Sequence, residues 1–445
     1  MQAIQRILSI VLLSGMLALA GADEPAPVED TKRLDTIQYG IEAQVIELLS
    51  TLKSEKNGEY KVELLKAFDA STSPKLKAAI LDFFGAMEFK DAEDRSAVLI
   101  QQRDTQPDSL VAAAFSYLIV LKSKEALSEA VTILDEDEQR YVQAAIKAIG
   151  AAGSDSEAEV LRKAYEADGV EPAVKEAIVL ALGAMKSGPS YELLASIVSN
   201  EESGKTLRMY ACSALGDLGD ERAVEVLAGA SVASDPNVRA YAIAALGNFS
   251  TKDAHSAVRE GLRDGHVLPR IAAAKAAGKA RDVDAIPFLE FKVSYDPEQA
   301  VRIASITALS EIGGSRVDDF LVSFLLEIKN STQYRSAALG AIIARGAEKA
   351  RTAALKAFTL AQAEKDRTVF TAFARATTAV DDKGSLPFVE LMLGDKDFSM
   401  KLGAIAWAER NKAKELEGLI KTLSETDSND AVKKRATQAL GRLAS

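Results

Sequence analysis

Apolar residues recur at intervals of three and four along most of this 445-residue chain, with polar and charged residues between them. The stretch 235–249, DPNVRAYAIAALGNF, shows the pattern clearly. Asp235 suits an N-cap, Pro236 suits the first position of a helix, and Gly247 stands near its end. The spacing therefore predicts an amphipathic helix over 236–246.

Similar stretches occur throughout the sequence and align on the residue that follows an Ala-Leu or equivalent pair. Neighbouring copies of this marker residue are 30 to 35 residues apart, which is the length of two short helices with their turns. Twelve copies indicate a repeat architecture rather than a set of globular domains. The markers are Gly85, Val120, Gly150, Gly183, Gly216, Gly247, Gly278, Ser310, Ile343, Thr378, Glu409 and Gly441.

The columns of this alignment have a physical meaning. Two positions before the marker, nine of the twelve copies have alanine, whose small side chain predicts close contact between neighbouring repeats. Four positions and one position before the marker, most residues are Ile, Val or Leu, and this spacing places them on one buried face. The alanine column comprises Ala148, Ala181, Ala214, Ala245, Ala276, Ala308, Ala341, Ala376 and Ala439.

A further amphipathic helix follows each marker after a short turn, as in residues 221–231 and 385–393. Each copy is therefore expected to be a helical hairpin, which cannot bury both of its apolar faces alone. Stacking buries them, so the sequence predicts an all-α fold. The expected architecture is an α-solenoid of about twelve hairpins, wound as a right-handed superhelix with a concave and a convex face.

The pattern D-P-x-V-R-x-x-A-x-x-A-L-G at 235–247 resembles the HEAT repeat, in particular the bacterial PBS-lyase HEAT-like variety. The resemblance covers roughly residues 60–445 and is strongest over 142–312. It implies an α-solenoid whose marker-bearing helices line the concave face, in a family dominated by binding and scaffolding roles. It also implies an alternative, an enzyme of the bilin lyase type, which the lack of a cluster of titratable residues disfavours.

The sequence departs from this pattern in its last third. Glycine is replaced at four markers after Gly278, and a tryptophan, Trp407, occupies the alanine column. An indole does not fit the space that alanine leaves, so we expect wider spacing between repeats or a bend in this part. The replaced markers are Ser310, Ile343, Thr378 and Glu409.

The N-terminus has the pattern of a secretory signal peptide, with one basic residue, an apolar run over 7–20, and an Ala-Gly-Ala sequence that suits cleavage after Ala22. The run is shorter than the roughly 20 residues that span a bilayer, although an uncleaved anchor is the alternative. The sequence thus predicts export, to the periplasm or out of the cell. The predicted parts are a signal peptide over 1–22, a linker over 23–33, an atypical helical N-terminal cap over 34–69, and the repeat solenoid over 70–445.

Charge and composition exclude several functions. The formal net charge of −11 argues against nucleic-acid binding, which depends on Lys and Arg neutralising phosphates. His255 and His266 are in no metal motif and are expected on the surface, and the single cysteine, Cys212, stands in the buried apolar column. We therefore expect no catalytic, metal or cofactor site. The expectation is a non-enzymatic protein that binds a protein or cell-envelope partner along its concave face, as a monomer, with an oligomer as the alternative.

A basic residue stands eight positions before the marker in nine of the twelve copies. One interpretation is a structural ladder, in which each cation reaches a carboxylate or a turn carbonyl of the neighbouring repeat. The other is a stripe of cations for an acidic partner. The same column is basic in the general HEAT pattern, which favours the ladder. The column includes Lys175, Arg208, Arg239, Arg270, Arg302 and Arg335.

Tyr210 and Tyr241 occupy one column, six positions before the marker, in adjacent copies. Eight other copies have alanine there. Aromatic residues at helical spacing are commonly core residues, but large side chains where other copies have small ones also suit a partner-binding hot spot. Tyr210 and Tyr241 are thus the candidate partner-binding residues.

Overall fold

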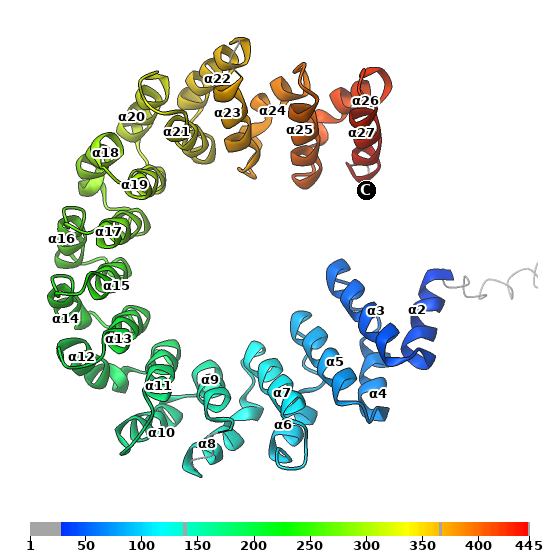
Figure 1. Cartoon of the computed structure of the whole chain (residues 1–445), viewed down its shortest axis with the longest axis vertical. Coiled ribbons are helices and arrows are strands. Elements are labelled where there is room, and N and C mark those ends of the chain that lie inside the picture. The colour runs from blue at the N-terminus through cyan, green and yellow to red at the C-terminus, as the bar shows by residue number, and fades with distance from the viewer. Residues whose placement is uncertain (1–27, 137–139, 365–366, 444–445) are drawn as a thin grey trace, which may run out of the picture. The chain divides into compact units, whose positions relative to one another are not determined.

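The computed structural model describes residues 28–136, 140–364 and 367–443, and every regular element within them is a helix. The all-α prediction is therefore confirmed. The chain divides into two compact units, with the boundary between Val170 and Glu171, and each unit is described by itself (Figure 1). The predicted signal peptide, residues 1–22, lies outside the described residues.

The helices of the first unit correspond to the predicted cap and the first three markers. They are α2 (Val28–Tyr39), α3 (Glu42–Glu55), α4 (Lys61–Ala70), α5 (Pro74–Ala86), α6 (Glu93–Gln101), α7 (Asp108–Val120), α8 (Leu127–Asp135), α9 (Val142–Ala152) and α10 (Asp155–Glu166). Because α2 begins at Val28, residues 28–33 of the predicted linker are helical instead.

The second unit contains the other nine markers, each in the last turn of a helix or directly after it. Its helices are α11 (Pro172–Met185), α12 (Tyr191–Ser199), α13 (Lys205–Leu218), α14 (Ala223–Ala230), α15 (Pro236–Leu246), α16 (Lys252–Gly261), α17 (Val267–Lys279), α18 (Ile286–Tyr295), α19 (Gln299–Ile312), α20 (Ser315–Leu326), α21 (Thr332–Arg345), α22 (Glu348–Ala363), α23 (Thr368–Thr378), α24 (Leu386–Leu393), α25 (Phe398–Arg410), α26 (Glu417–Thr426) and α27 (Asp430–Leu443).

Helix α15 shows how the sequence produces one repeat element. The Asp235 carboxylate accepts hydrogen bonds from the backbone N–H groups of Asn237 and Val238, at 2.7 and 3.3 Å, and so caps the helix. Pro236 occupies the first helical turn, where no backbone N–H is needed. The helix ends before Gly247, as predicted.

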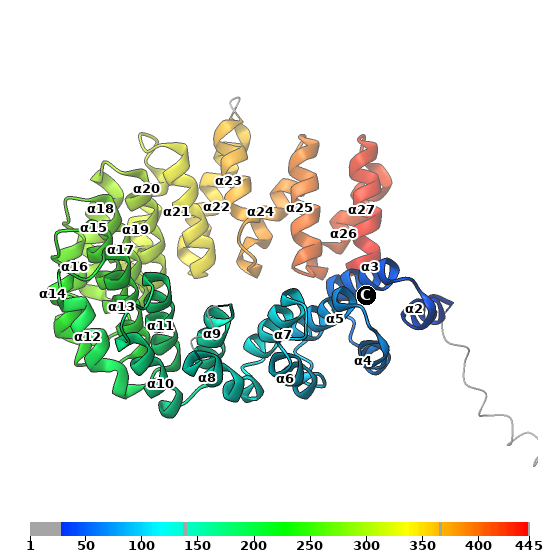
Figure 2. The same cartoon turned by 60° about the horizontal axis from the view of Figure 1, so that its bottom comes forward.

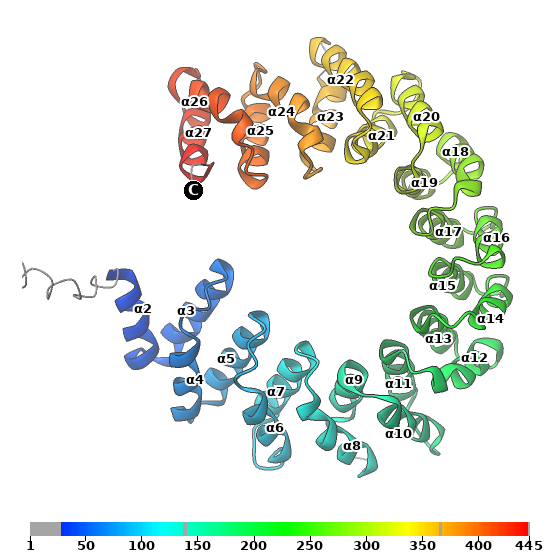
Figure 3. The same ribbon diagram turned by 180° about the vertical axis from the view of Figure 1, so that it is seen from behind.

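The helices of the second unit form two layers. The marker-bearing helices, from α11 to α27 in odd numbers, pack side by side in one layer and line the concave side of this unit (Figures 1 and 3). The even-numbered helices form the other layer. The view turned by 60° shows that four of the marker-bearing helices run nearly parallel to one another: α21, α23, α25 and α27 (Figure 2). This arrangement confirms a solenoid of stacked hairpins.

Neighbouring marker helices touch through the glycine and alanine columns. A Cβ atom added to Gly183 would lie 2.6 Å from the Cβ of Ala214, and one added to Gly247 would lie 2.8 Å from the Cβ of Ala276. Gly216 stands in the same relation to Ala245, at 2.8 Å. The alanine column is therefore an inter-repeat contact, as predicted, and the glycine column is its other half.

This contact, rather than a turn that needs positive φ, explains the glycines at the markers. Gly183, Gly216 and Gly278 lie inside helices, and Gly247 ends its helix with a negative φ. Positive φ occurs instead at other glycines, such as Gly219 and Gly346. Glycine occupies these markers because the next helix lies against them and leaves no room for a side chain.

Trp407 is accommodated by burial and a hydrogen bond. Its side chain is 1% exposed, and its indole N–H donates to the backbone carbonyl of Val380, in the preceding repeat, at 2.7 Å. At the replaced marker Ser310, the hydroxyl donates to the carbonyl of Ala341 in the following repeat, at 3.3 Å. The wider spacing expected near these residues stays a prediction.

Candidate functional site

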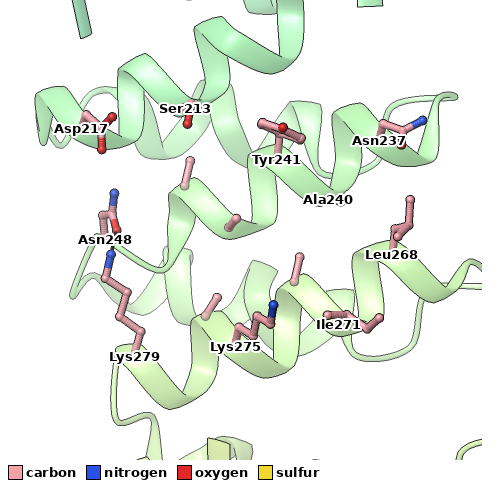
Figure 4. Close-up of a pocket in the computed structure, with 14 residues that line it drawn as sticks. Ser213, Asp217, Asn237, Ala240, Tyr241, Asn248, Leu268, Ile271, Lys275 and Lys279 are labelled. Atoms are coloured by element: carbon pink, nitrogen blue, oxygen red, sulfur yellow. Dashed lines mark hydrogen bonds between the residues drawn. The ribbon is translucent and has the colours of Figure 1, made fainter. Parts of the chain in front are cut away.

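The site that stands out within the second unit is a groove on its marker layer, between α13, α15 and α17 (Figure 4). It has a volume of about 500 Å³. The floor consists of small side chains, including Ala240, Ala244 and Ala276. A groove of this size with an apolar floor and few polar groups is the usual form of a binding site.

One end of the groove is largely apolar, and Asn237 is the polar residue that also lines it. Tyr241 is 38% exposed and Leu268 is 41% exposed, which are large fractions for side chains of this kind in a helical layer. Ile271 lies beside Leu268, one helical turn further along α17 (Figure 4). These three side chains can therefore contact an apolar group that enters the groove.

The other end of the groove is polar. Asp217, Asn248 and Lys279 lie there, and Lys275 stands between the two ends (Figure 4). The Lys279 ammonium donates to the Asn248 side-chain oxygen at 2.5 Å, and the Asn248 amide donates to the carbonyl of Gly216 at 2.8 Å. Asn248 thus joins three successive marker helices and holds Lys279 in place.

The repeat itself positions these side chains. The larger side chains that line the groove stand ten, seven, six or three positions before a marker, or one position after it. These positions share one face of a helix. The buried columns four and one before the marker point away from the groove, and the alanine column, two before the marker, lies at its floor. The face toward the groove is therefore the one free to vary between repeats.

Of the two predicted partner-binding residues, only Tyr241 lines the groove. Tyr210, one repeat earlier, is half-buried and is not among the lining residues. Sequence reasoning missed Leu268, Ile271 and Lys275, because it examined a single column. The signal was present, since all three stand in columns on the same helix face as Tyr241.

The residues of the basic column make two kinds of intramolecular contact: ion pairs with carboxylates, and contacts with carbonyls or aromatic rings. Arg239 and Arg270 each form a bidentate pair with a carboxylate in the turn that follows their hairpin, Asp264 and Asp296, with N to O distances of 2.7 to 3.1 Å. The remaining guanidinium nitrogen of Arg270 donates to the carbonyls of Asp264 and Gly265. These cations are occupied inside the fold.

Other members of the column contact carbonyls or rings. The Nε atoms of Arg208, Arg302 and Arg335 donate to the carbonyls of Val198, Val293 and Leu325, respectively, at 2.7 to 3.1 Å. The Arg302 guanidinium also lies 3.9 Å from the centre of the Tyr334 ring. Lys175 is half-buried. These are the contacts of a structural ladder, and binding of an acidic partner by this column stays a prediction.

Burial and hydrogen bonding act in opposite directions on the aspartates of the ladder. Burial alone would raise the pKa of the Asp296 carboxyl. Hydrogen bonds from Arg270, from the backbone N–H of Glu298 and from Lys292 outweigh burial, so the pKa lies below its ordinary value of 3.8. Asp264, with Arg239 and the backbone N–H of His266 as donors, is lowered in the same way.

Side chains suited to chemistry are dispersed in this fold. Within the described ranges, no three His, Cys, Asp or Glu side chains are grouped so as to hold a metal ion. Cys212 is fully buried, and burial raises the pKa of its thiol to about 12. His266 caps α17, since its Nδ1 accepts from the backbone N–H of Leu268, whereas His255 is half-buried rather than on the surface as expected.

Comparisons with known proteins agree with the repeat pattern. A family model described as Spirochaete HEAT repeat protein matches residues 37–439. The chain belongs to this family. The match begins within the segment predicted as an atypical cap, so the HEAT repeat family model extends further toward the N-terminus than the marker pattern does. No curated protein sequence matches the chain. None of the helices in the part described is long and apolar enough to cross a membrane.

Solved structures similar to this HEAT repeat protein are themselves helical-repeat proteins. The complex of the phycocyanin lyase subunits CpcE and CpcF from Nostoc sp. PCC7120 has 20% identity and a TM-score of 0.33, over 64% of this chain and 94% of that chain. A mutant of Kap121p has 14% identity and a TM-score of 0.44, over 93% of this chain and 51% of that chain. Kap95p, from a structure that concerns its binding to RanGDP, has 14% identity and a TM-score of 0.46, over 95% and 67%. Each likeness concerns the fold alone.

Proposed function

We propose that this HEAT repeat protein is a non-enzymatic binding protein that holds a segment of a protein partner in the groove between α13, α15 and α17. The observation that supports the proposal is that Tyr241 and Leu268 are partly exposed over a floor of alanines. Hot spots of protein interfaces are enriched in such aromatic anchors.

The partner is further proposed to be an exported protein or another cell-envelope component. Support comes from the N-terminal sequence alone, whose apolar run and Ala-Gly-Ala site are typical of a signal peptide. On this proposal the groove acts outside the cytoplasm, as part of a periplasmic or secreted scaffold.

The groove can be tested by filling it. Ala244 is exposed and lines the groove, so Ala244→Arg places a long side chain in it without disturbing the helix. We expect wild-type protein to capture a partner from its own cell envelope, and the variant to lose most of that partner. Mass spectrometry of the captured material is the measurement.

A matched control is Ser256→Arg, which adds the same side chain to an exposed position of α16 in the other layer. This variant should capture the partner as the wild type does, and all three proteins should melt at the same temperature. Equal capture by Ala244→Arg and wild type would show that the partner binds elsewhere.

A further inference from the structure

We infer that the occupant of the groove is a short, extended peptide segment with a carboxylate side chain two or three residues from a large apolar side chain. The inference rests on the proposed function and adds the chemistry and spacing of the segment. It follows from three features of the groove: an exposed ammonium group, an apolar end, and the distance between them.

Lys275 supplies the cation. Its side chain is exposed on α17 at the centre of the groove, and no carboxylate in the part of the chain that the structure describes lies within ion-pair distance of its ammonium. Other cations nearby are paired: Arg239 with Asp264, Arg259 with Asp282, and Arg270 with Asp296.

The local charge of the groove is opposite to that of the chain. The groove contains two lysines and one aspartate, Asp217, whereas the whole chain has a net charge of −11. Lys279 is already hydrogen-bonded to Asn248, so Lys275 is the cation left for a ligand. Charge complementarity therefore favours an acidic group in the occupant.

The apolar end supplies the second half of the recognition. Tyr241, Leu268 and Ile271 surround space above Ala240 and Ala272, and two of the three side chains are more than a third exposed. Covering this surface with an apolar side chain removes it from water, which favours binding. Because the floor consists of alanines, the space above it can hold a large apolar side chain of the occupant, such as Leu, Met or an aromatic residue.

Helix geometry gives the spacing. Lys275 is four residues from Ile271 and seven from Leu268, which corresponds to about 6 and 10 Å along the axis of α17. In an extended peptide, side chains on the same side are two positions and about 7 Å apart in a β conformation, and three positions and about 9 Å apart in a polyproline II conformation. An acidic residue that reaches Lys275 therefore places the residue two or three positions away over the apolar end.

The size of the groove favours an extended segment over a helix. The lining positions of α17, from Leu268 to Lys279, span about 16 Å, which five extended residues cover. A helix that spans the same distance needs about eleven residues, a length at which an isolated helix is only marginally stable in water. An extended segment therefore covers the groove with fewer residues.

Selection from a phage-displayed library of random nonapeptides tests this inference on the wild-type chain. We expect enrichment of Asp or Glu two or three positions from Leu, Ile, Met, Phe or Trp. On the variant Lys275→Glu, we expect Lys or Arg to replace the acidic residue at the same spacing. The control variant Lys252→Glu, with the same change at an exposed position of α16, should select the wild-type pattern.

A peptide that the wild type selects is then synthesised, labelled and measured by fluorescence anisotropy. Lys275→Glu should weaken its binding by about tenfold, and Lys275→Gln by less, since an exposed pair contributes a few-fold and reversal adds repulsion. Added salt should weaken binding to the wild type more than binding to Lys275→Gln. Lys252→Glu should bind the peptide as the wild type does.

Several outcomes would overturn the inference. These are no enriched pattern, a pattern without acidic residues, no change with Lys275→Glu, and apolar residues spaced by four and seven as on a helix. If Ala244→Arg abolishes partner capture while any of these occurs, the groove binds a partner of different chemistry and only this inference fails. If capture is also unaffected by Ala244→Arg, the proposed function fails as well.

Discussion

At the scale of single residues, the distance between neighbouring repeats is set by contacts between glycine and alanine. Gly216 lies against Ala245, and Gly247 lies against Ala276, with no space for a Cβ atom on either glycine. Ala245 is buried in this contact, whereas Ala244, its neighbour in sequence, is exposed to the groove. Adjacent alanines on α15 thus differ in burial, although both line the groove: Ala245 packs against Gly216, and Ala244 is exposed.

This difference gives a matched pair of substitutions. Ala245→Phe should lower the free energy of unfolding by about 1 to 3 kcal/mol or more, because the ring overpacks the contact with Gly216. Ala244→Phe should change it by about 0.5 kcal/mol or less, since the ring enters the groove. Urea denaturation followed by circular dichroism measures both. Equal stability of Ala245→Phe and wild type would mean that the alanine column does not hold the repeats together.

At the scale of elements, the turn before several marker helices contains one aspartate with two functions. Each of these carboxylates accepts hydrogen bonds from a basic residue within the preceding marker helix or directly before it, and from the backbone N–H two residues later. The turn is thereby tied to the helices on both sides of it. The pairs are Asp264 with Arg239, Asp296 with Arg270, Asp395 with Arg367, and Asp427 with Lys401.

These turns make stability depend on pH. The pKa values of Asp264, Asp296, Asp395 and Asp427 are lowered in the folded chain, so the unfolded chain binds more protons as pH falls toward and below the ordinary value of 3.8. Their contribution to stability is therefore complete above about pH 5 and lost as pH falls through the folded pKa values. Thermal unfolding between neutral pH and pH 3 measures this loss.

Asp296→Asn isolates one turn. We expect it to be less stable than the wild type at neutral pH and to lose less stability on acidification, because a carboxylate with a lowered pKa has been removed. Asp253→Asn, at an exposed position of α16, should follow the wild-type curve. A steep loss in acid that is unchanged in Asp296→Asn would assign the pH dependence to other groups.

At the scale of the whole molecule, successive marker helices contact mainly their neighbours, so each repeat can vary its exposed face without affecting distant ones. This explains how a groove with two lysines occurs in a chain with a net charge of −11. It also explains why the family is recognised from buried columns that say little about the ligand.

Export is a property of the whole chain and is tested at this scale. We expect the mature protein to begin at Asp23 in the exported fraction of the cell, as shown by N-terminal sequencing. Replacing Leu12 and Leu13 by Arg should interrupt the apolar run and retain the uncleaved chain inside. Gln5→Lys, which leaves the run intact, should be exported. An uncleaved wild-type chain in the membrane fraction would support an anchor instead.

Much of the repeat fold could be predicted because it depends on local spacing. The helix at 236–246, its Asp235 cap and the burial of the Ile, Val and Leu columns all follow from the period of the α-helix. The reason for the marker glycines could not be predicted, because a glycine that permits a turn and one that permits close packing are the same in sequence. The contact with the next helix distinguishes them.

The groove, too, could be predicted from the sequence only in part. The amino-acid pattern is sufficient to predict that the chain forms stacked helical hairpins, that its alanine column lies between them, and that Tyr241 is unusual in its column. The packing of the helices is needed to show that Tyr241 lines a groove with Leu268, Ile271 and Lys275, while Tyr210 does not. The physical reason is that periodicity fixes which face of each helix is buried, whereas a groove arises from side chains of three helices whose packing is set by contacts distant in sequence.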